Sequence, residues 1–163
     1  MEGAMFVTAD LYDAHHTSVQ VLNAQFRSFG RVRAFAGPAS TLHASENHHP
    51  VQKALETPGE GRVLVVDGEG LLAVGLMGDR LATLALKNGW AGAVLLGAVR
   101  DSAGLNALDF GVKALGTTAR RAWVAIEGRR DVVLTIAGAT IHPRDWVYAD
   151  EDAVIVSPSR LHP

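Results

Sequence analysis

Two aspartates and an arginine are the residues of this 163-residue sequence best suited to chemistry. Asp79 ends the stretch GLMGD (75–79), and after twenty intervening residues Arg100 and Asp101 follow the apolar run AGAVLLGAV (91–99). An aspartate is a hard oxygen ligand for Mg²⁺ or Mn²⁺, and an arginine offers a planar fork of donors to a carboxylate or enolate oxygen. Asp79 could accept hydrogen bonds from waters on such a metal. These residues together would bind a small oxyanion through a divalent metal held by Asp101.

Buried strands alternating with helices would bring these residues to one place. The continuous apolar runs RVLVVD (62–67) and AGAVLLG (91–97) are typical of strands buried on both faces, and LLAVG (71–75) predicts another strand. A helix is expected over 79–88, with Asp79 as its cap. If the strands are parallel, the loops after them meet at one edge, where open α/β sheets bind ligands.

The start of that helix has the features of an anion site. Gly75 and Gly78 let the backbone approach a ligand closely, and the first turn presents free N–H groups and the positive end of the helix dipole. A simpler interpretation also fits. Asp79 is often just a helix cap, and an Arg100–Asp101 pair after a strand is commonly a surface ion pair contributing under about 1 kcal/mol. The spacing alone leaves both interpretations open.

The remainder of the sequence predicts short elements and one domain. Thr8 is expected to cap a first helix, Pro50 to open another, and 31–44 to form a strand broken at a Gly-Pro pair. RAWVAIE (121–127) and the segments after it alternate in the manner of short strands. We therefore expect a single α/β domain over 1–163 with a mixed, largely buried sheet.

Composition excludes several classes of protein. The 48% hydrophobic content suits a globular chain, the net charge of −2 gives no basic excess for nucleic acid, and the absence of cysteine excludes disulfides and thiol sites. No apolar run approaches the roughly 20 residues that span a bilayer, and the N-terminal stretch is interrupted by acidic residues. We expect a soluble, cytoplasmic protein with no membrane and no direct nucleic-acid partner.

Histidine and tryptophan residues offer weaker candidates. The histidine pairs at 15–16 and 48–49 are adjacent in sequence, so the two side chains of a pair are not expected to share a metal. We expect these histidines to be solvated or to lie at helix ends. Trp123 is expected in the core or at a subunit interface.

The chain resembles the RraA-like family over nearly its whole length. The resemblance is carried by RVLVVDGEG (62–70), GDRLATLALKNGWAGAVLLGAVRD (78–101), LDFGVKALGTT (108–118) and WVYADEDAVIV (146–156). The family contains regulators of ribonuclease E activity and class II, metal-dependent 4-hydroxy-4-methyl-2-oxoglutarate aldolases. It implies a swivelling β/β/α fold and a homotrimeric ring with sites between subunits.

The resemblance also implies roles for individual residues. Gly78, Asp79, Arg80 and Leu81 match the loop that binds the pyruvyl substrate, Arg100 matches the arginine that contacts it, Asp101 matches the metal ligand, and Asp79 matches the aspartate that bonds to the metal's waters. The implied reaction breaks a carbon–carbon bond to give pyruvate enolate, and oxaloacetate decarboxylation passes through the same enolate.

Two departures bear on which reaction is expected. Many family members have an acidic residue three positions after the metal-binding aspartate, where this chain has Gly104, and longer aldolases carry a C-terminal extension with an acidic group. Both differences favour decarboxylation over aldol cleavage, which needs a base. The alternative is a non-catalytic regulator that binds and inhibits ribonuclease E. Asp101, which a regulator would not need, favours the enzyme.

Overall fold

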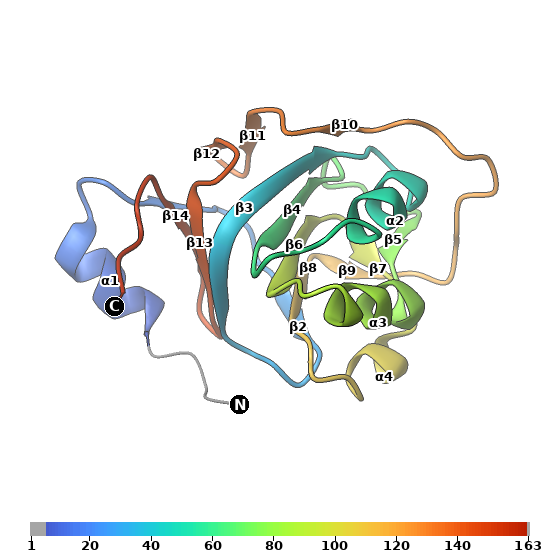
Figure 1. The fold of residues 1–163 in the computed structure, drawn as a ribbon, viewed down its shortest axis with the longest axis horizontal. Coiled ribbons are helices and arrows are strands. Elements are labelled where there is room, and N and C mark those ends of the chain that lie inside the picture. The colour runs from blue at the N-terminus through green and yellow to red at the C-terminus, as the bar shows by residue number, and fades with distance from the viewer. Residues whose placement is uncertain (1–5, 163) are drawn as a thin grey trace.

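The computed structural model describes residues 6–162, which form a curled mixed β-sheet; the helices between residues 49 and 105 pack on one face, and the first helix lies apart from them (Figure 1). The strand order is β1-β14-β13-β3-β4-β6-β8-β2, and β10 pairs with β3. The strands of this sheet are β1 (Gln20–Val21), β2 (Arg27–Phe29), β3 (Phe35–His43), β4 (Val63–Asp67), β6 (Gly92–Leu96), β8 (Val112–Ala114), β10 (Arg129–Arg130), β13 (Trp146–Ala149) and β14 (Val154–Ser157).

Two smaller sheets and four helices complete the fold. β5, β7 and β9 form a parallel three-stranded sheet, and β11 and β12 form an antiparallel pair. The bounds are β5 (Gly75–Met77), β7 (Ala98–Val99), β9 (Gly116–Thr117), β11 (Leu134–Ile136), β12 (Ala139–Ile141), α1 (Thr8–His15), α2 (His49–Leu55), α3 (Asp79–Lys87) and α4 (Ser102–Leu105).

The expected buried parallel strands are confirmed at the centre of the sheet. β3, β4, β6 and β8 are parallel neighbours, with β4 buried from Val63 to Val66. Leu64 and Val66 pack with the helices in one apolar cluster, whereas Val63 and Val65 pack with β11–β14 in another. Because both faces of β4 are covered, its sequence shows a continuous apolar run instead of an alternating one.

The strand expected over 71–75 is displaced toward the C-terminus. β5 begins at Gly75, which pairs with Ala98 of β7, and the preceding Leu71 and Leu72 are 43% and 47% exposed. An apolar run indicates burial, but it does not determine which of its residues find a neighbouring strand. This shift places the end of β5 directly before the start of α3.

Two helix caps differ from the expectation. Thr8 is the first residue of α1, and its N–H and hydroxyl donate to Asp150 at 2.8 Å each, so a distant carboxylate caps this helix. Gly78 is the N-cap of α3, and Asp79 makes no capping hydrogen bond. The carboxylate of Asp79 is therefore free for another contact.

Two further expectations about strands were wrong. β3 runs unbroken through Gly37 and Pro38, because its parallel pairing with β4 begins only at Ala39 and the missing N–H of Pro38 costs no bond there. The segment 121–127 forms no strand. It crosses the surface without a pairing partner, and Trp123 is 79% exposed.

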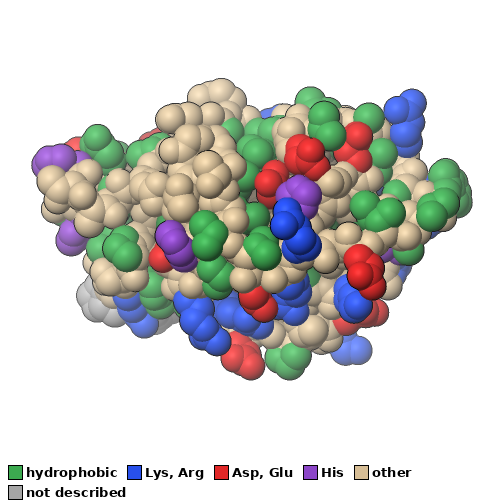
Figure 2. Space-filling model, turned by 90° about the horizontal axis from the view of Figure 1, so that it is seen from above, with side chains coloured by type: hydrophobic (Ala, Val, Ile, Leu, Met, Phe, Trp, Pro, Cys, Tyr) green, Lys and Arg blue, Asp and Glu red, His purple; other side chains and the backbone are tan. Residues whose placement is uncertain are grey.

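Figure 2 shows acidic, basic and hydrophobic side chains interspersed on one face of the molecule. Within residues 6–162, no helix has the length and apolar character needed to cross a bilayer.

Candidate active site

Three parallel strands end at the same place and carry the candidate site. The loops after β5, β7 and β9 surround a cavity of about 150 Å³. The predicted convergence of the loops after GLM (75–77) and AV (98–99) is thus confirmed, and a third loop joins them. The cavity is lined by His48, Gly75, Met77, Gly78, Arg80, Leu81, Arg100, Asp101 and Arg121.

Two glycines make room for the charged side chains. A β-carbon on Gly78 would collide with Oδ2 of Asp101, and one on Gly75 would collide with Cγ of Arg100. Gly78 is in an extended conformation that any residue can adopt, so the lack of space is what favours glycine there. Both charged side chains therefore lie against the backbone that leads into α3.

Asp101 occupies an unusual backbone conformation. Its φ of 55° and ψ of 44° place it in the left-handed region, which a non-glycine residue adopts at a cost. Its carbonyl accepts the N–H of Leu105 at 2.8 Å, and the preceding Arg100 N–H donates to Met77 at 2.9 Å. These bonds fix the turn between β7 and α4 and leave the carboxylate of Asp101 exposed at the cavity.

The cavity is strongly electropositive. Arg80, Arg100 and Arg121 contribute three guanidinium groups, against the single carboxylate of Asp101. Burial and, to a smaller extent, the charges of His49 and of the three arginines together lower the pKa of His48 from 6.5 to about 4. His48 is therefore a neutral imidazole at pH 7, and the remaining charges favour an anionic ligand.

Asp79 stands slightly apart from the other predicted residues. The structure brings Gly78, Arg80, Leu81, Arg100 and Asp101 to the cavity lining, but the carboxylate of Asp79 lies against Gly104 of α4. Its role toward metal-bound water stays a prediction.

Sequence reasoning missed His48 and Arg121. His48 directly precedes α2, as expected of a helix-end residue, but it also lines the cavity, and its ring centroid lies 4.1 Å from that of His49. Arg121 lies in the loop after β9, and treating GT (116–117) as a third parallel strand would have placed it at the same edge.

The site is open on a second side. Arg100 and Asp101 also border a cavity of about 530 Å³, together with Ser102, Ala103, Thr117, Thr118 and Ala119. The two central residues can therefore be reached from either cavity.

The residues fit a weakly held divalent cation. Within residues 6–162, no group of three or more His, Asp or Glu side chains could enclose a metal. Mg²⁺ commonly keeps several waters and takes only one or two protein carboxylates plus the substrate. The carboxylate of Asp101, which lines the cavity, is the group that could supply such a ligand.

Comparison with known proteins places this arrangement in a family. The "Aldolase/RraA" model of the RraA-like family matches residues 8–156. A protein of Alkalilimnicola ehrlichii, named "Putative 4-hydroxy-4-methyl-2-oxoglutarate aldolase", is 48% identical over 94% of this chain and 96% of its own. A protein of the same name from Laribacter hongkongensis is 47% identical over 96% and 98%.

Solved structures of similar fold carry descriptions other than aldolase. A Geobacillus kaustophilus protein described as an S-adenosylmethionine:2-dimethylmenaquinone methyltransferase has a TM-score of 0.92 at 43% identity, covering 96% of this chain and 97% of its own. The "RNA-processing inhibitor RraA from Thermus thermophilis" has a TM-score of 0.92 at 37% identity, covering 98% and 96%. The expected family and fold are confirmed: the chain belongs to the RraA-like family.

Proposed function

We propose that this protein is a divalent-metal-dependent lyase that acts on 2-oxo acids and forms pyruvate enolate. Oxaloacetate decarboxylation is the main reaction, and aldol cleavage of 4-hydroxy-4-methyl-2-oxoglutarate is a second reaction of the same site. The observation that carries the proposal is the placement of Arg100 and Asp101 together at the end of β7, across Gly78 from the start of α3.

Each residue of the cavity has a distinct task in this proposal. Asp101 would hold Mg²⁺ or Mn²⁺, which supplies a Lewis acid for the 2-oxo group. Arg100 would donate hydrogen bonds to the oxygen at C2 as negative charge develops on it. Arg80, Arg121 and the free N–H groups at the start of α3 would bind the substrate carboxylates.

Decarboxylation demands less of the site than aldol cleavage does. Carbon dioxide leaves the substrate without a base, whereas aldol cleavage needs a group that takes the C4 hydroxyl proton. Residue 104 is glycine and lies against Asp79, so it supplies no carboxylate. The relatives' name supports the aldolase reaction, and the cavity residues support the shared enolate chemistry more directly.

A regulatory function is a second candidate. The Thermus structure is described as an RNA-processing inhibitor, and the present chain exposes an apolar segment on which a protein such as ribonuclease E could dock. In that segment Trp123, Val124 and Ile126 are 79%, 75% and 48% exposed.

The methyltransferase description of the Geobacillus protein finds less support in this chain. Gly68, Gly70 and Ala73 have the spacing of a nucleotide-binding glycine motif after β4, but no helix begins there. Such motifs bind phosphate groups through the N-terminus of the helix that follows.

The exposed apolar segment also supports self-association. A homotrimer with sites between subunits would cover Trp123 and could enclose the 530 Å³ cavity beside Asp101. Analytical ultracentrifugation of the wild type and of Trp123→Ser tests this part: the account expects a trimer that the substitution weakens.

The function itself is tested with two substrates. Pyruvate release is measured from oxaloacetate and from 4-hydroxy-4-methyl-2-oxoglutarate, each with Mg²⁺, with Mn²⁺ and with EDTA. The proposal expects metal-dependent turnover of oxaloacetate well above the rate with metal alone. If the protein turned over neither substrate but the same preparation inhibited ribonuclease E, the result would contradict the lyase function and support the regulatory one.

A further inference from the structure

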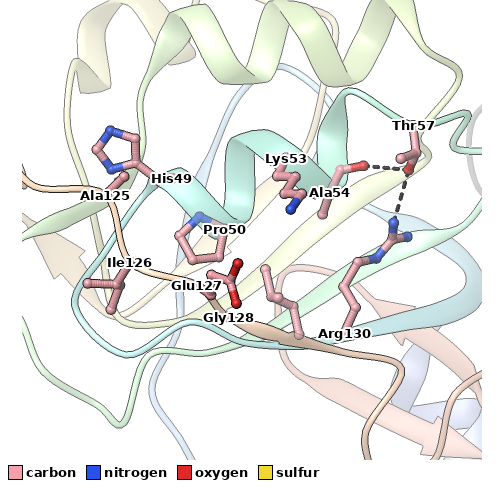
Figure 3. A pocket seen from close by; sticks show the side chains of 11 residues that line it. His49, Pro50, Lys53, Ala54, Thr57, Ala125, Ile126, Glu127, Gly128 and Arg130 are labelled. Atoms are coloured by element: carbon pink, nitrogen blue, oxygen red, sulfur yellow. Dashed lines mark hydrogen bonds between the residues drawn. The ribbon is translucent and has the colours of Figure 1, made fainter.

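A second cavity, separate from the candidate active site, lies between α2 and the segment that leads into β10 (Figure 3). Its volume is about 490 Å³, within the range of small-molecule sites. It shares no lining residue with the 150 Å³ cavity, although His49 lines one and its neighbour His48 lines the other. None of its residues takes part in the proposed reaction.

An arginine at this cavity lacks a counter-ion. The guanidinium of Arg130 donates to two neutral hydroxyls, those of Thr57 at 3.2 Å and Ser40 at 3.0 Å. Its Nε is buried and has no hydrogen-bond partner, and no acidic side chain within residues 6–162 forms an ion pair with it. Buried charges and donors in proteins are normally paired, so the guanidinium of Arg130 is suited to bind an anion.

The rest of the lining combines a second cation with apolar walls. Lys53 of α2 points into the same space and makes no hydrogen bond or ion pair with a described residue (Figure 3). The apolar walls come from Leu42, Pro50, Ala54, Ala125 and Ile126. Glu127 is the one acidic group of the lining, and it is exposed, whereas Arg130 is partly buried.

The walls of the cavity are held in place by close packing. A β-carbon on Gly128 would collide with the carbonyl of His43 and with Cβ of Pro50, so the segment runs tightly against β3 and α2 at this point. Farther along, Asn47 donates to the carbonyl of Val124 at 2.8 Å. The stretch 125–127 that lines the cavity is therefore anchored at both of its ends.

We propose that this cavity is a binding site for a small organic carboxylate with an apolar body. The carboxylate accepts hydrogen bonds from the guanidinium of Arg130 and from Lys53, while the hydrocarbon part lies between Pro50 and Ile126. The site takes anions that carry an apolar group and discriminates against neutral molecules of the same shape. This proposal is independent of the lyase reaction.

The test follows the side-chain N–H resonance of Arg130 by NMR. Full-length ¹⁵N-labelled protein is titrated with benzoate, with benzamide as the neutral molecule of the same shape, and with acetate as the carboxylate without an apolar body. Benzoate is expected to shift the side-chain N–H signals of Arg130, Nε–H included. Benzamide and acetate should each bind about tenfold more weakly, as expected for the loss of a charged hydrogen bond or of apolar contact.

Variants separate this site from the rest of the surface. Arg130→Gln should weaken benzoate binding about tenfold or more, whereas Arg129→Gln, the adjacent and exposed arginine of β10, should leave it unchanged. Lys53→Gln provides a second variant, and we expect it to fold normally because the side chain of Lys53 is exposed. It should weaken binding by a smaller factor.

Three results would overturn the proposal. Equal affinities for benzoate and benzamide would show an apolar cavity without anion recognition. Benzoate shifts confined to Arg80, Arg100 and Arg121 would place the carboxylate in the other cavity. An unmoved Arg130 Nε–H signal in the wild type, with unchanged affinity in Lys53→Gln, would show that neither cation binds it.

Discussion

Gly104 of α4 lies against the carboxylate of Asp79 at the start of α3, with no space for a side chain between them. A β-carbon on residue 104 would stand 2.9 Å from Cβ and Cγ of Asp79 and closer still to Oδ2. The carboxylate of Asp79 therefore occupies the space that a side chain on residue 104 would need. The glycine and the aspartate form one packing unit beside the candidate active site.

Gly104→Ala is predicted to destabilise the protein through this contact. Overpacking of this kind costs about 1–3 kcal/mol, and we expect a loss of that order in the free energy of unfolding measured in urea. The same substitution in an Asp79→Gly background should cost much less, because both the carboxylate and the Cβ that the new methyl group would meet are gone. Any change in helix propensity is common to both backgrounds, so equal effects in the two would contradict the contact.

Gly78→Ala is predicted to impair the site while the fold survives. The added methyl would push the carboxylate of Asp101 away, and a displacement of about 1 Å at a reacting group can reduce the rate about a hundredfold. Steady-state kinetics with oxaloacetate measures the loss. Gly116→Ala is the matched control in β9 of the same three-stranded sheet, since a β-carbon there meets only the side chain of Leu72, at 3.7 Å or more. A similar fall in both variants would point to general damage.

Arg121→Gln is predicted to weaken anion binding. Removing one of the three guanidinium groups should raise the Kd of oxalate, measured by calorimetry with Mg²⁺ present, about tenfold or more. Arg120→Gln removes an exposed neighbour that does not line the cavity and should change the Kd little. If the two variants behaved alike, Arg121 would not belong to the site.

His48 predicts how stability and ligands respond to pH. Its pKa is about 4 in the folded protein and 6.5 in the unfolded chain. Between pH 6.5 and about 4 the unfolded state is therefore protonated at His48 while the folded state is not. The free energy of unfolding should therefore fall as the pH is lowered from 6.5 to about 4, and His48→Gln should reduce that slope. Oxalate bound among the arginines should raise the pKa of His48 in an NMR titration, because it offsets their charge. An unchanged pKa would place the anion elsewhere.

Much of the scaffold could be predicted because burial is visible in sequence. The apolar runs of β4 and β6 and the periodic face of α3 indicated buried strands and an amphipathic helix, and the structure confirms them. The side chains after β5 and β7 were predicted to meet because parallel strands share one edge. The first inference depends on patterns within a single segment, and the second depends on the rule that neighbouring parallel strands end at the same edge.

The remaining features depend on contacts between distant segments, which local patterns do not reveal. Thr8 was expected to cap its helix, but Asp150, which is 142 residues away, accepts its hydrogen bonds. The alternating segment 121–127 lacks a strand beside it and stays on the surface, and there it brings Arg121 to the cavity. The cap of α1 depends on Asp150, and the conformation of 121–127 depends on the lack of a neighbouring strand. The sequence of either segment alone therefore could not predict these features.

The central claim is that Arg100 and Asp101 form one metal-dependent site, and pyruvate release from oxaloacetate tests it most directly. The rate is measured with and without Mg²⁺ or Mn²⁺ for the wild type, Asp101→Ala and Arg100→Ala. The account predicts metal-dependent turnover in the wild type that both substitutions reduce at least about a hundredfold. A wild-type rate no higher than that of the metal alone, or full activity in either variant, would contradict it.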